Sequence, residues 1–146
     1  MIYVVIPVHN RKKITRSCLA SLQKQDTKHF TVIVVDDGST DGTSEMICSE
    51  FPDTVLLQGD GNLWWVGSIN KGIRYALSQC KSEDLVLSLN DDLIVKTIYI
   101  SNLMDAAKEL PNAIIGSVET TMHSPYIIKS GGIVVNWKTA KRKVLN

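Results

Sequence analysis

Short apolar runs rich in β-branched residues alternate along this chain with segments whose apolar residues recur at helical spacing. The runs predict strands at residues 2–6, 31–35, 55–57, 85–89, 113–118, 126–128 and 133–135. Helical spacing of apolar residues predicts helices at residues 12–24, 43–50 and 98–110. A further helix is predicted after a loop at 61–67, and its apolar residues are Ile69, Ile73, Ala76 and Leu77. Because strands that alternate with helices build mostly parallel, doubly wound sheets, we predict an α/β fold of that kind.

Composition and length place few further limits on the chain. Its 146 residues, 44% of them hydrophobic and 21% charged, predict one globular domain over residues 1–146. A formal net charge of +1 creates no overall field that would recruit nucleic acid, so we expect no nucleic-acid partner. Cys18, Cys48 and Cys80 are too far apart for metal-ligand spacing, and we expect reduced, mostly buried thiols in a cytoplasmic protein.

Polar residues follow three of the predicted strands. They occupy residues 7–11 after the first strand, 36–39 after the second and 90–92 after the fourth. The carboxyl ends of parallel strands meet at one edge of a sheet, and open α/β sheets bind their ligands at that edge. We therefore expect the three segments to converge on one site.

The acidic residues of these segments each have a functional and a structural interpretation. Asp36 and Asp37 are candidates to accept hydrogen bonds from a base or ribose, with Gly38 allowing close backbone approach. The alternative is a helix-capping turn, which Asp, Gly, Ser and Thr residues also favour. Asp92 is the candidate metal ligand, because Mg²⁺ or Mn²⁺ needs only one or two carboxylates besides phosphate oxygens. The alternative for residues 90–92 is a solvated acidic turn.

Basic and aromatic residues near these segments also carry two interpretations. His9 and Arg11 are candidates to contact a base or phosphates, or else they belong to a surface loop and to the start of a helix. Trp64 and Trp65 are suited either to stacking on a nucleotide or sugar or to filling the core. We expect one of the two tryptophans to lie in the core.

Phosphate binding has one further candidate region. Asn70 and Lys71 are predicted to open a helix whose amino end faces phosphate, although a lysine at such a position is more often a solvated helix residue. The chain contains neither a GxxxxGK[ST] phosphate loop nor a GxGxxG fingerprint. ATPase and dinucleotide-binding functions therefore lack their usual support.

In combination, these segments resemble the family 2 glycosyltransferases of the GT-A fold. The resemblance rests on residues 5–10, 33–42, 61–73 and 87–92, which occur in the order and at the spacing found in that family. The tryptophan-containing segment is similar to that of bacterial enzymes that build cell-surface polysaccharide, including rhamnosyltransferase-like members. The resemblance implies a Rossmann-like fold and sugar transfer from a nucleotide-diphosphate sugar to a saccharide or lipid-linked acceptor, in the cytoplasm or at the inner face of the membrane.

The resemblance also implies a set of site residues. Asp37 would bind the base or ribose, and Asp92, in the position of the Asp-x-Asp motif of the family, would hold Mg²⁺ or Mn²⁺ against the donor diphosphate. The residues expected to bind the nucleotide sugar are Pro7, His9, Asn10, Arg11, Asp36, Asp37, Gly38, Asn62, Trp65, Gly67, Asn70, Asn90 and Asp91. The chain departs from the family at Asn90, which replaces the first aspartate of the motif, and at Ile69, where many members carry arginine.

The chain also lacks a convincing catalytic base. Inverting members of the family use an Asp or Glu beyond the donor-binding half to deprotonate the acceptor. No Asp or Glu follows Glu119 here, and His123 is expected to be a surface residue of a loop. We therefore expect a glycosyltransferase truncated at its C-terminal acceptor half, with apolar surface available for self-association. The alternatives are a non-catalytic nucleotide-sugar-binding module and a sugar nucleotidyltransferase of related fold. The nucleotidyltransferase is less favoured, because no glycine- and arginine-rich loop follows the first strand.

Overall fold

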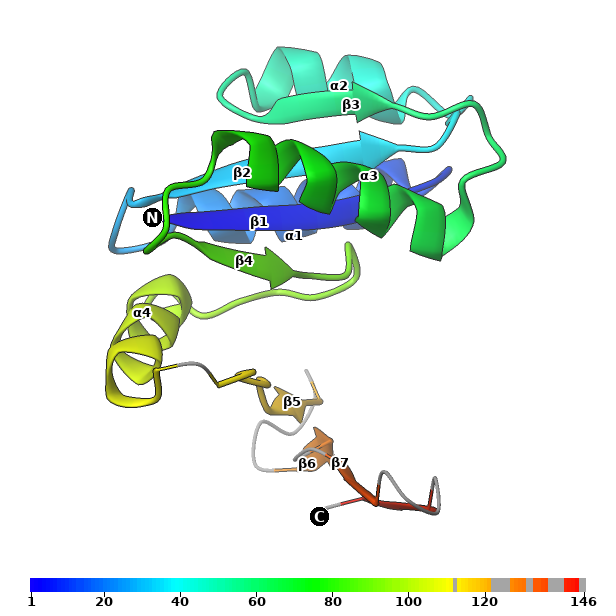
Figure 1. Ribbon diagram of the computed structural model, residues 1–146. Coiled ribbons are helices and arrows are strands. Elements are labelled where there is room, and N and C mark those ends of the chain that lie inside the picture. Colours follow the sequence, from blue (N-terminus) through cyan, green and yellow to red (C-terminus); the bar gives the residue numbers. More distant parts are fainter. Residues whose placement is uncertain (112, 122–126, 131–132, 137–140, 145–146) are drawn as a thin grey trace. The chain divides into compact units, whose positions relative to one another are not determined.

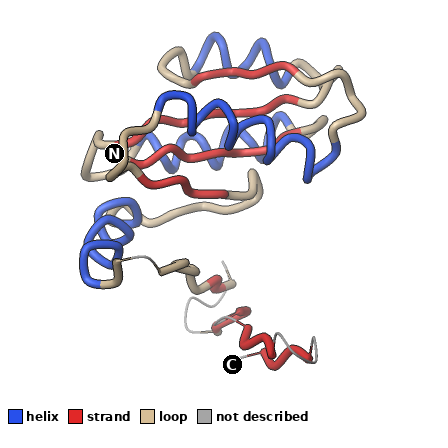
Figure 2. The backbone as a smooth tube through the Cα atoms, viewed as in Figure 1, coloured by secondary structure: helices blue, strands red, loops and turns tan. Residues whose placement is uncertain are grey.

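The computed structural model describes residues 1–111, 113–121, 127–130, 133–136 and 141–144. The chain forms two compact units, Met1–Asp105 and Ala106–Asn146. The first unit holds a parallel sheet and its flanking helices (Figures 1 and 2). Within the described residues, no helix has both the length and the apolar character needed to cross a membrane.

A four-stranded parallel sheet forms the centre of the first unit, in the order β3-β2-β1-β4. Its strands are β1 (Ile2–Val8), β2 (Phe30–Asp36), β3 (Val55–Gln58) and β4 (Leu85–Ser88). Val8 pairs with Asp36, and Asp36 pairs with Gln58, so these three strands end at the same edge. β1 is buried along its whole length, as a central strand covered by helices on both faces should be. The predicted mostly parallel α/β fold is confirmed.

Three helices cover the two faces of this sheet, as Figure 1 shows. They are α1 (Lys12–Gln23), α2 (Thr43–Glu50) and α3 (Trp64–Gln79). Successive side chains of β1 point to opposite faces, so Val4 packs in one core with Leu19 of α1, while Val5 packs in the other with Ile69 of α3. A Cβ atom at Gly72 would lie 2.3 Å from Cγ1 of Val5. The glycine therefore allows α3 to approach β1 closely.

The predicted helix bounds agree closely with the structure except at α3. The predictions 12–24, 43–50 and 98–110 correspond to α1, α2 and α4 (Tyr99–Glu109), each within one residue at either end. The prediction of a loop over 61–67 was wrong in its second half, because α3 begins at Trp64. The N–H of Gly67 donates to the carbonyl of Leu63 at 2.9 Å, so Gly67 is a helical residue rather than a loop residue.

The strand predicted at residues 85–89 is present but less buried than its composition predicts. Leu85 and Val86 are each 37% exposed, and only Leu89, just beyond β4, is fully buried. The reason is position, because β4 is an edge strand of the described sheet whereas β1 and β2 are central.

The second unit contains two antiparallel strand pairs. β5 (Glu119–Thr120) pairs with β6 (Ile128–Ser130), and β7 (Ile133–Asn136) pairs with β8 (Lys141–Val144). The strand predicted at 133–135 is confirmed within β7, whereas Tyr126 of the strand predicted at 126–128 lies outside the described residues. The strand predicted at 113–118 was wrong, because pairing begins only at Glu119 and the apolar side chain of Ile114 is fully exposed.

The three cysteines are all free thiols, but they differ in burial. Cys18 in α1 is buried, Cys80 is partly buried and Cys48 in α2 is exposed. Burial raises the pKa of the Cys18 thiol to about 12, so this thiol stays protonated at neutral pH. The expectation of mostly buried thiols is confirmed for Cys18 and was wrong for Cys48, which lies on the outer side of its helix.

Candidate functional site

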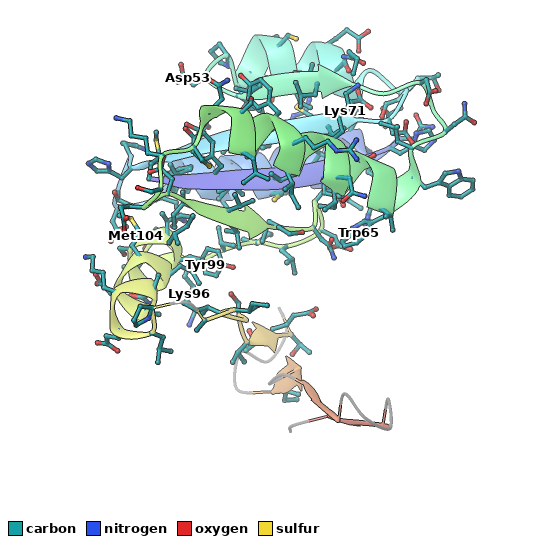
Figure 3. The ribbon with its side chains drawn as sticks, in the orientation of Figure 1. Asp53, Trp65, Lys71, Lys96, Tyr99 and Met104 are labelled. Carbon is teal, nitrogen blue, oxygen red and sulfur yellow. The ribbon has the colours of Figure 1, made fainter. Side chains whose placement is uncertain are left out.

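The polar segments that follow β1, β2 and β4 meet at one cavity, as the sequence predicts. The cavity has a volume of about 340 Å³. Its lining residues are Pro7, Val8, His9, Arg11, Asp37, Gly61, Trp64, Trp65, Ser68, Asn90, Asp91 and Asp92. In Figure 3, Trp65 marks this edge of the sheet, whereas Asp53 lies at the opposite end of the strands. The cavity is therefore at the carboxyl edge, where α/β sheets of this kind bind ligands.

The structure separates the predicted site residues into two groups. Those that line the cavity are Pro7, His9, Arg11, Asp37, Trp65, Asn90, Asp91 and Asp92. Those that do not line it are Asn10, Asp36, Gly38, Asn62, Gly67 and Asn70. Four lining residues are absent from the predicted set: Val8, Gly61, Trp64 and Ser68. A helix beginning at Trp64 would have indicated Ser68, because residues four apart share one helix face.

Asp37 joins the end of β2 to the start of α3. It is buried, and its Oδ1 accepts from the N–H of Gly61 at 2.9 Å while its Oδ2 accepts from the N–H of Trp64 at 2.8 Å. A Cβ atom at Gly59 would lie 2.5 Å from Oδ1, so this glycine leaves the space that the carboxylate occupies. Each carboxylate oxygen retains a second lone pair with which to accept from a ligand.

Asp36 organises the turn beneath the cavity rather than its wall. Its carboxylate is buried and accepts from the N–H of Ser39 at 3.0 Å and from the hydroxyl of Ser44 in α2. Gly38 adopts a φ of +70°, and a Cβ there would lie 3.0 Å from the nitrogen of Gly61. For Asp36 and Gly38 the structure therefore shows the turn that the sequence offered as the alternative to ligand binding.

Asn10 and His9 fix the loop between β1 and α1 against the loop after β2. Asn10 has a φ of +52°, and its Oδ1 accepts from the N–H of Thr40 at 2.7 Å while its own N–H donates to Ser39 Oγ at 2.8 Å. His9 Nδ1 contacts the carbonyl oxygen of Asp37, and Asn10 Nδ2 donates to His9 Nε2 at 3.0 Å. The two contacts hold the imidazole ring between the two loops.

Arg11 links the start of α1 to the acidic segment after β4. Its Nη1 donates to Oδ1 of Asp91 at 2.9 Å and its Nη2 to Oδ2 of Asp92 at 3.2 Å. Thr15 Oγ1 donates to the second oxygen of Asp91 at 3.3 Å. Burial raises the pKa of the Asp91 carboxyl, and the charge of Arg11 and the hydrogen bond from Thr15 offset part of that rise.

The two acidic side chains of this cluster differ in accessibility. The side chain of Asp91 is 4% exposed and both of its oxygens are hydrogen-bonded, whereas that of Asp92 is 48% exposed. Among the described residues no group of three His, Cys, Asp or Glu side chains could hold a metal ion by itself. A cation in this cavity would therefore need ligand oxygens besides Asp92, which suits Mg²⁺ or Mn²⁺ bound to a diphosphate.

Neither tryptophan of the pair lies in the core, so that expectation was wrong. Trp64 is 80% exposed and Trp65 is 54% exposed, and both line the cavity from the first turn of α3. The residue of α3 that lies in the core is instead Ile69, because the side of α3 that carries Ile69 faces the sheet. Nε1 of Trp65 donates to Oδ1 of Asn90 at 3.1 Å, which joins α3 to the segment after β4.

The two residues named for the phosphate region, Asn70 and Lys71, lie outside the cavity, and so does Asn62. Because α3 begins at Trp64, Asn70 and Lys71 lie in its second turn and not at its amino end, so that placement was wrong. Lys71 Nζ donates to the carbonyl of Gln58, and the Asn62 side chain contacts the carbonyl of Asp60 at 3.4 Å. Ile69 is buried in the core, so no basic side chain takes its place at the cavity.

A parallel doubly wound sheet with an acidic cluster and an arginine at its carboxyl edge defines an α/β domain with a ligand-binding cavity at that edge. Residues 3–142 match the sequence profile described as Glycosyl transferase family 2, and the chain belongs to that family. The resemblance drawn from its motifs is confirmed over nearly the whole chain.

Relatives from several bacteria agree with this assignment. Glycosyltransferase GlyA of Streptococcus pneumoniae is 36% identical over 106 residues, which cover 67% of this chain and 14% of that protein. N-acetylglucosaminyl-diphospho-decaprenol L-rhamnosyltransferase of Mycobacterium tuberculosis is 30% identical over 101 residues, which cover 65% of this chain and 33% of that protein. A crystal structure of S. aureus TarS in complex with UDP-GlcNAc has a TM-score of 0.60 at 25% identity. The match covers 80% of this chain and 37% of the TarS chain. The chain thus spans well under half the length of each.

Proposed function

We propose that this chain binds a nucleotide-diphosphate sugar together with a divalent cation and supplies the donor half of a glycosyltransferase. The observation that carries the proposal is the cavity that joins Asp37 to the cluster of Arg11, Asp91 and Asp92 in a chain of family 2. The TarS complex with UDP-GlcNAc supports a nucleotide-sugar donor, and the decaprenol-linked saccharide in the name of the rhamnosyltransferase supports a lipid-linked acceptor in bacterial surface polysaccharide synthesis.

The cavity residues divide the recognition of such a donor between them. Asp37 offers its remaining lone pairs to the N–H of a base or to ribose hydroxyls, held in place by its two backbone donors. Arg11 offers further N–H groups to phosphate oxygens, a geometry for which guanidinium is well suited. Trp65 provides an exposed ring beside these groups, on which a base or sugar can stack.

The residues present fit a divalent cation at Asp92. Its carboxylate is half exposed, lines the cavity and is paired with Arg11 through Oδ2. When bound, the cation would neutralise the charge that builds on the departing nucleoside diphosphate. Asp91 would not hold it directly, because this carboxylate is buried and both of its oxygens are already hydrogen-bonded.

Transfer to an acceptor needs a base that the described part of the chain does not identify. No Asp or Glu follows Glu119 in the sequence, and His123 lies outside the described residues. The second candidate, a nucleotide-sugar-binding module, stays a prediction. The single domain over 1–146, the self-association and the cytoplasmic location at the membrane face stay predictions.

Calorimetric titration with UDP, GDP, dTDP and their sugars, each with and without Mn²⁺, tests the proposal. We expect one nucleotide to bind, more tightly with Mn²⁺, and the variant Asp92→Asn to lose most of the Mn²⁺ dependence. Asp53→Asn serves as the matched control, because Asp53 is an exposed acid at the other end of the sheet (Figure 3). Failure of every nucleotide to bind with the metal present would overturn the proposal. Hydrolysis of the bound nucleotide sugar then separates an enzyme from a binding module.

A further inference from the structure

The contact between Trp65 and Asn90 determines what Asn90 can offer to a ligand. The two side chains come from α3 and from the segment after β4, and both line the cavity. Trp65 Nε1 lies 3.1 Å from Asn90 Oδ1. An indole N–H can only donate, so the partner atom of Asn90 must be its carbonyl oxygen and not its amide nitrogen. The tryptophan therefore fixes the orientation of the amide.

With its oxygen engaged, Asn90 presents a hydrogen-bond donor to the cavity. Its Nδ2 carries two N–H groups, and neither of them is bonded to another described residue. Asn90 is exposed at the cavity wall and is held through its backbone as well, since the Cys18 thiol contacts its carbonyl oxygen at 3.8 Å. The two donors are thus available to a bound molecule.

The charges around Asn90 favour a donor at this position. Asp91 and Asp92 follow it directly, and Arg11 is the basic side chain paired with both. A carboxylate at position 90 would place a third negative charge beside a ligand that is itself anionic, whereas the amide adds no charge. One lone pair of Asn90 Oδ1 accepts the N–H of Trp65, and the amide N–H groups are the hydrogen-bond donors of this side chain.

We propose that Trp65 holds Asn90 as a specificity-determining hydrogen-bond donor to an acceptor oxygen of the donor substrate, on its diphosphate or on its sugar. This inference rests on the proposed nucleotide-sugar function. Trp65 then has two roles that can be separated, because its ring can stack on a ligand while its N–H positions Asn90.

A double-mutant cycle with Trp65→Phe and Asn90→Ala tests the inference, measured as the Kd of the nucleotide sugar. Phenylalanine keeps an aromatic ring, but the ring is smaller than indole and has no N–H. We expect each single variant to weaken binding about 3- to 10-fold, the effect of one hydrogen bond. In the Asn90→Ala background, Trp65→Phe should have almost no further effect. Independent losses that multiply in the double variant would overturn the inference.

Two further measurements identify the acceptor oxygen and the role of charge. If Asn90→Ala weakens the nucleoside diphosphate and the nucleotide sugar alike, the oxygen belongs to the diphosphate, and if only the nucleotide sugar is affected, it belongs to the sugar. An equal loss for the free nucleoside, which has neither the phosphates nor the transferred sugar, would contradict both assignments. Asn90→Asp should weaken binding of the nucleotide sugar, because a carboxylate replaces both N–H donors with acceptors and adds a negative charge, and unchanged or tighter binding would contradict the inference.

Two controls separate a loss of binding from a loss of folding. Val66→Ala is the matched control, because Val66 is the next residue of α3, is exposed and does not line the cavity. Circular dichroism verifies that each variant folds. A wild-type chain that binds no nucleotide would overturn both proposals, whereas binding without coupling between Trp65 and Asn90 would overturn this inference alone.

Discussion

Oδ2 of Asp37 lies 2.8 Å from the backbone nitrogen of Trp64 and accepts its N–H, so the end of β2 directly fixes the first turn of α3. The same carboxylate also accepts the N–H of Gly61 through its other oxygen. One buried side chain therefore fixes the loop before α3 and the first turn of α3, which carries both tryptophans, and it also forms part of the cavity wall. Its structural role and its proposed binding role are connected.

Asp37→Asn tests this connection. An amide nitrogen cannot accept an N–H, so one of the two backbone donors would lose its partner. We expect the free energy of unfolding to fall by about 1–3 kcal/mol and the nucleotide affinity to fall at least about tenfold. Urea denaturation and calorimetry measure the two effects. Unchanged stability and binding, equal to those of Asp53→Asn, would contradict the role given to Asp37.

Arg11→Met tests the cluster around Asp91. The variant would leave a buried carboxylate with only Thr15 as a side-chain partner, and we expect a loss of about 1–3 kcal/mol in the free energy of unfolding. Arg16→Met is the control, because Arg16 in the same helix pairs with Glu50, which is largely exposed. That pair should contribute less than about 1 kcal/mol. Equal effects in urea denaturation would refute the prediction.

Asp41→Ala tests a cap shared by two helices. Asp41 accepts from the N–H of Lys12 at the start of α1 at 2.9 Å and from the N–H and hydroxyl of Thr43 at the start of α2. The hydrogen bond from the Thr43 hydroxyl, followed by that from Lys12, lowers the pKa of the Asp41 carboxyl below its reference value of 3.8. At neutral pH we expect the variant to be less stable by about 1 kcal/mol, the usual contribution of a cap.

The pH dependence of this difference has a definite sign. A carboxyl whose pKa is lowered on folding adds its stability above the unfolded value of 3.8, and this stability is lost as the pH falls through the folded value. The gap between wild type and Asp41→Ala should therefore be constant from pH 7 to about 5 and should narrow in stronger acid. A gap that widens on acidification would be inconsistent with the cap.

Gly72→Ala tests the contact of α3 with the sheet. Alanine favours a helix over glycine by about 1 kcal/mol, but its Cβ would lie 2.3 Å from Val5 Cγ1 and 3.1 Å from Val35 Cγ2. Overpacking costs about 1–3 kcal/mol, so we expect net destabilisation in urea denaturation. Gly116→Ala is the control, since no atom lies within 4 Å of the Cβ that it would add. A stabilised Gly72→Ala variant would show that this contact is loose.

Local patterns were sufficient to predict most of the first unit. The helical spacing in α1 and the turn residues before α2 place those helices within one residue of their observed bounds. The convergence of Asp37 with Asp92 was also predictable, because parallel strands bring their carboxyl ends to one edge. The start of α3 was not predictable in this way, since it depends on a hydrogen bond that the N–H of Trp64 donates to a side chain 27 residues earlier.

The amino-acid sequence was sufficient to predict the alternation of strands and helices, the family, and the acidic segment at the end of β4. Those features follow from periodicity and from residues adjacent in the chain. The tertiary structure was needed to distinguish neighbouring aspartates. Asp36 lies in a turn whereas Asp37 lines the cavity, and Asp91 is buried whereas Asp92 is accessible. Burial and hydrogen-bond partners come from segments far apart in the chain, and no local pattern contains them.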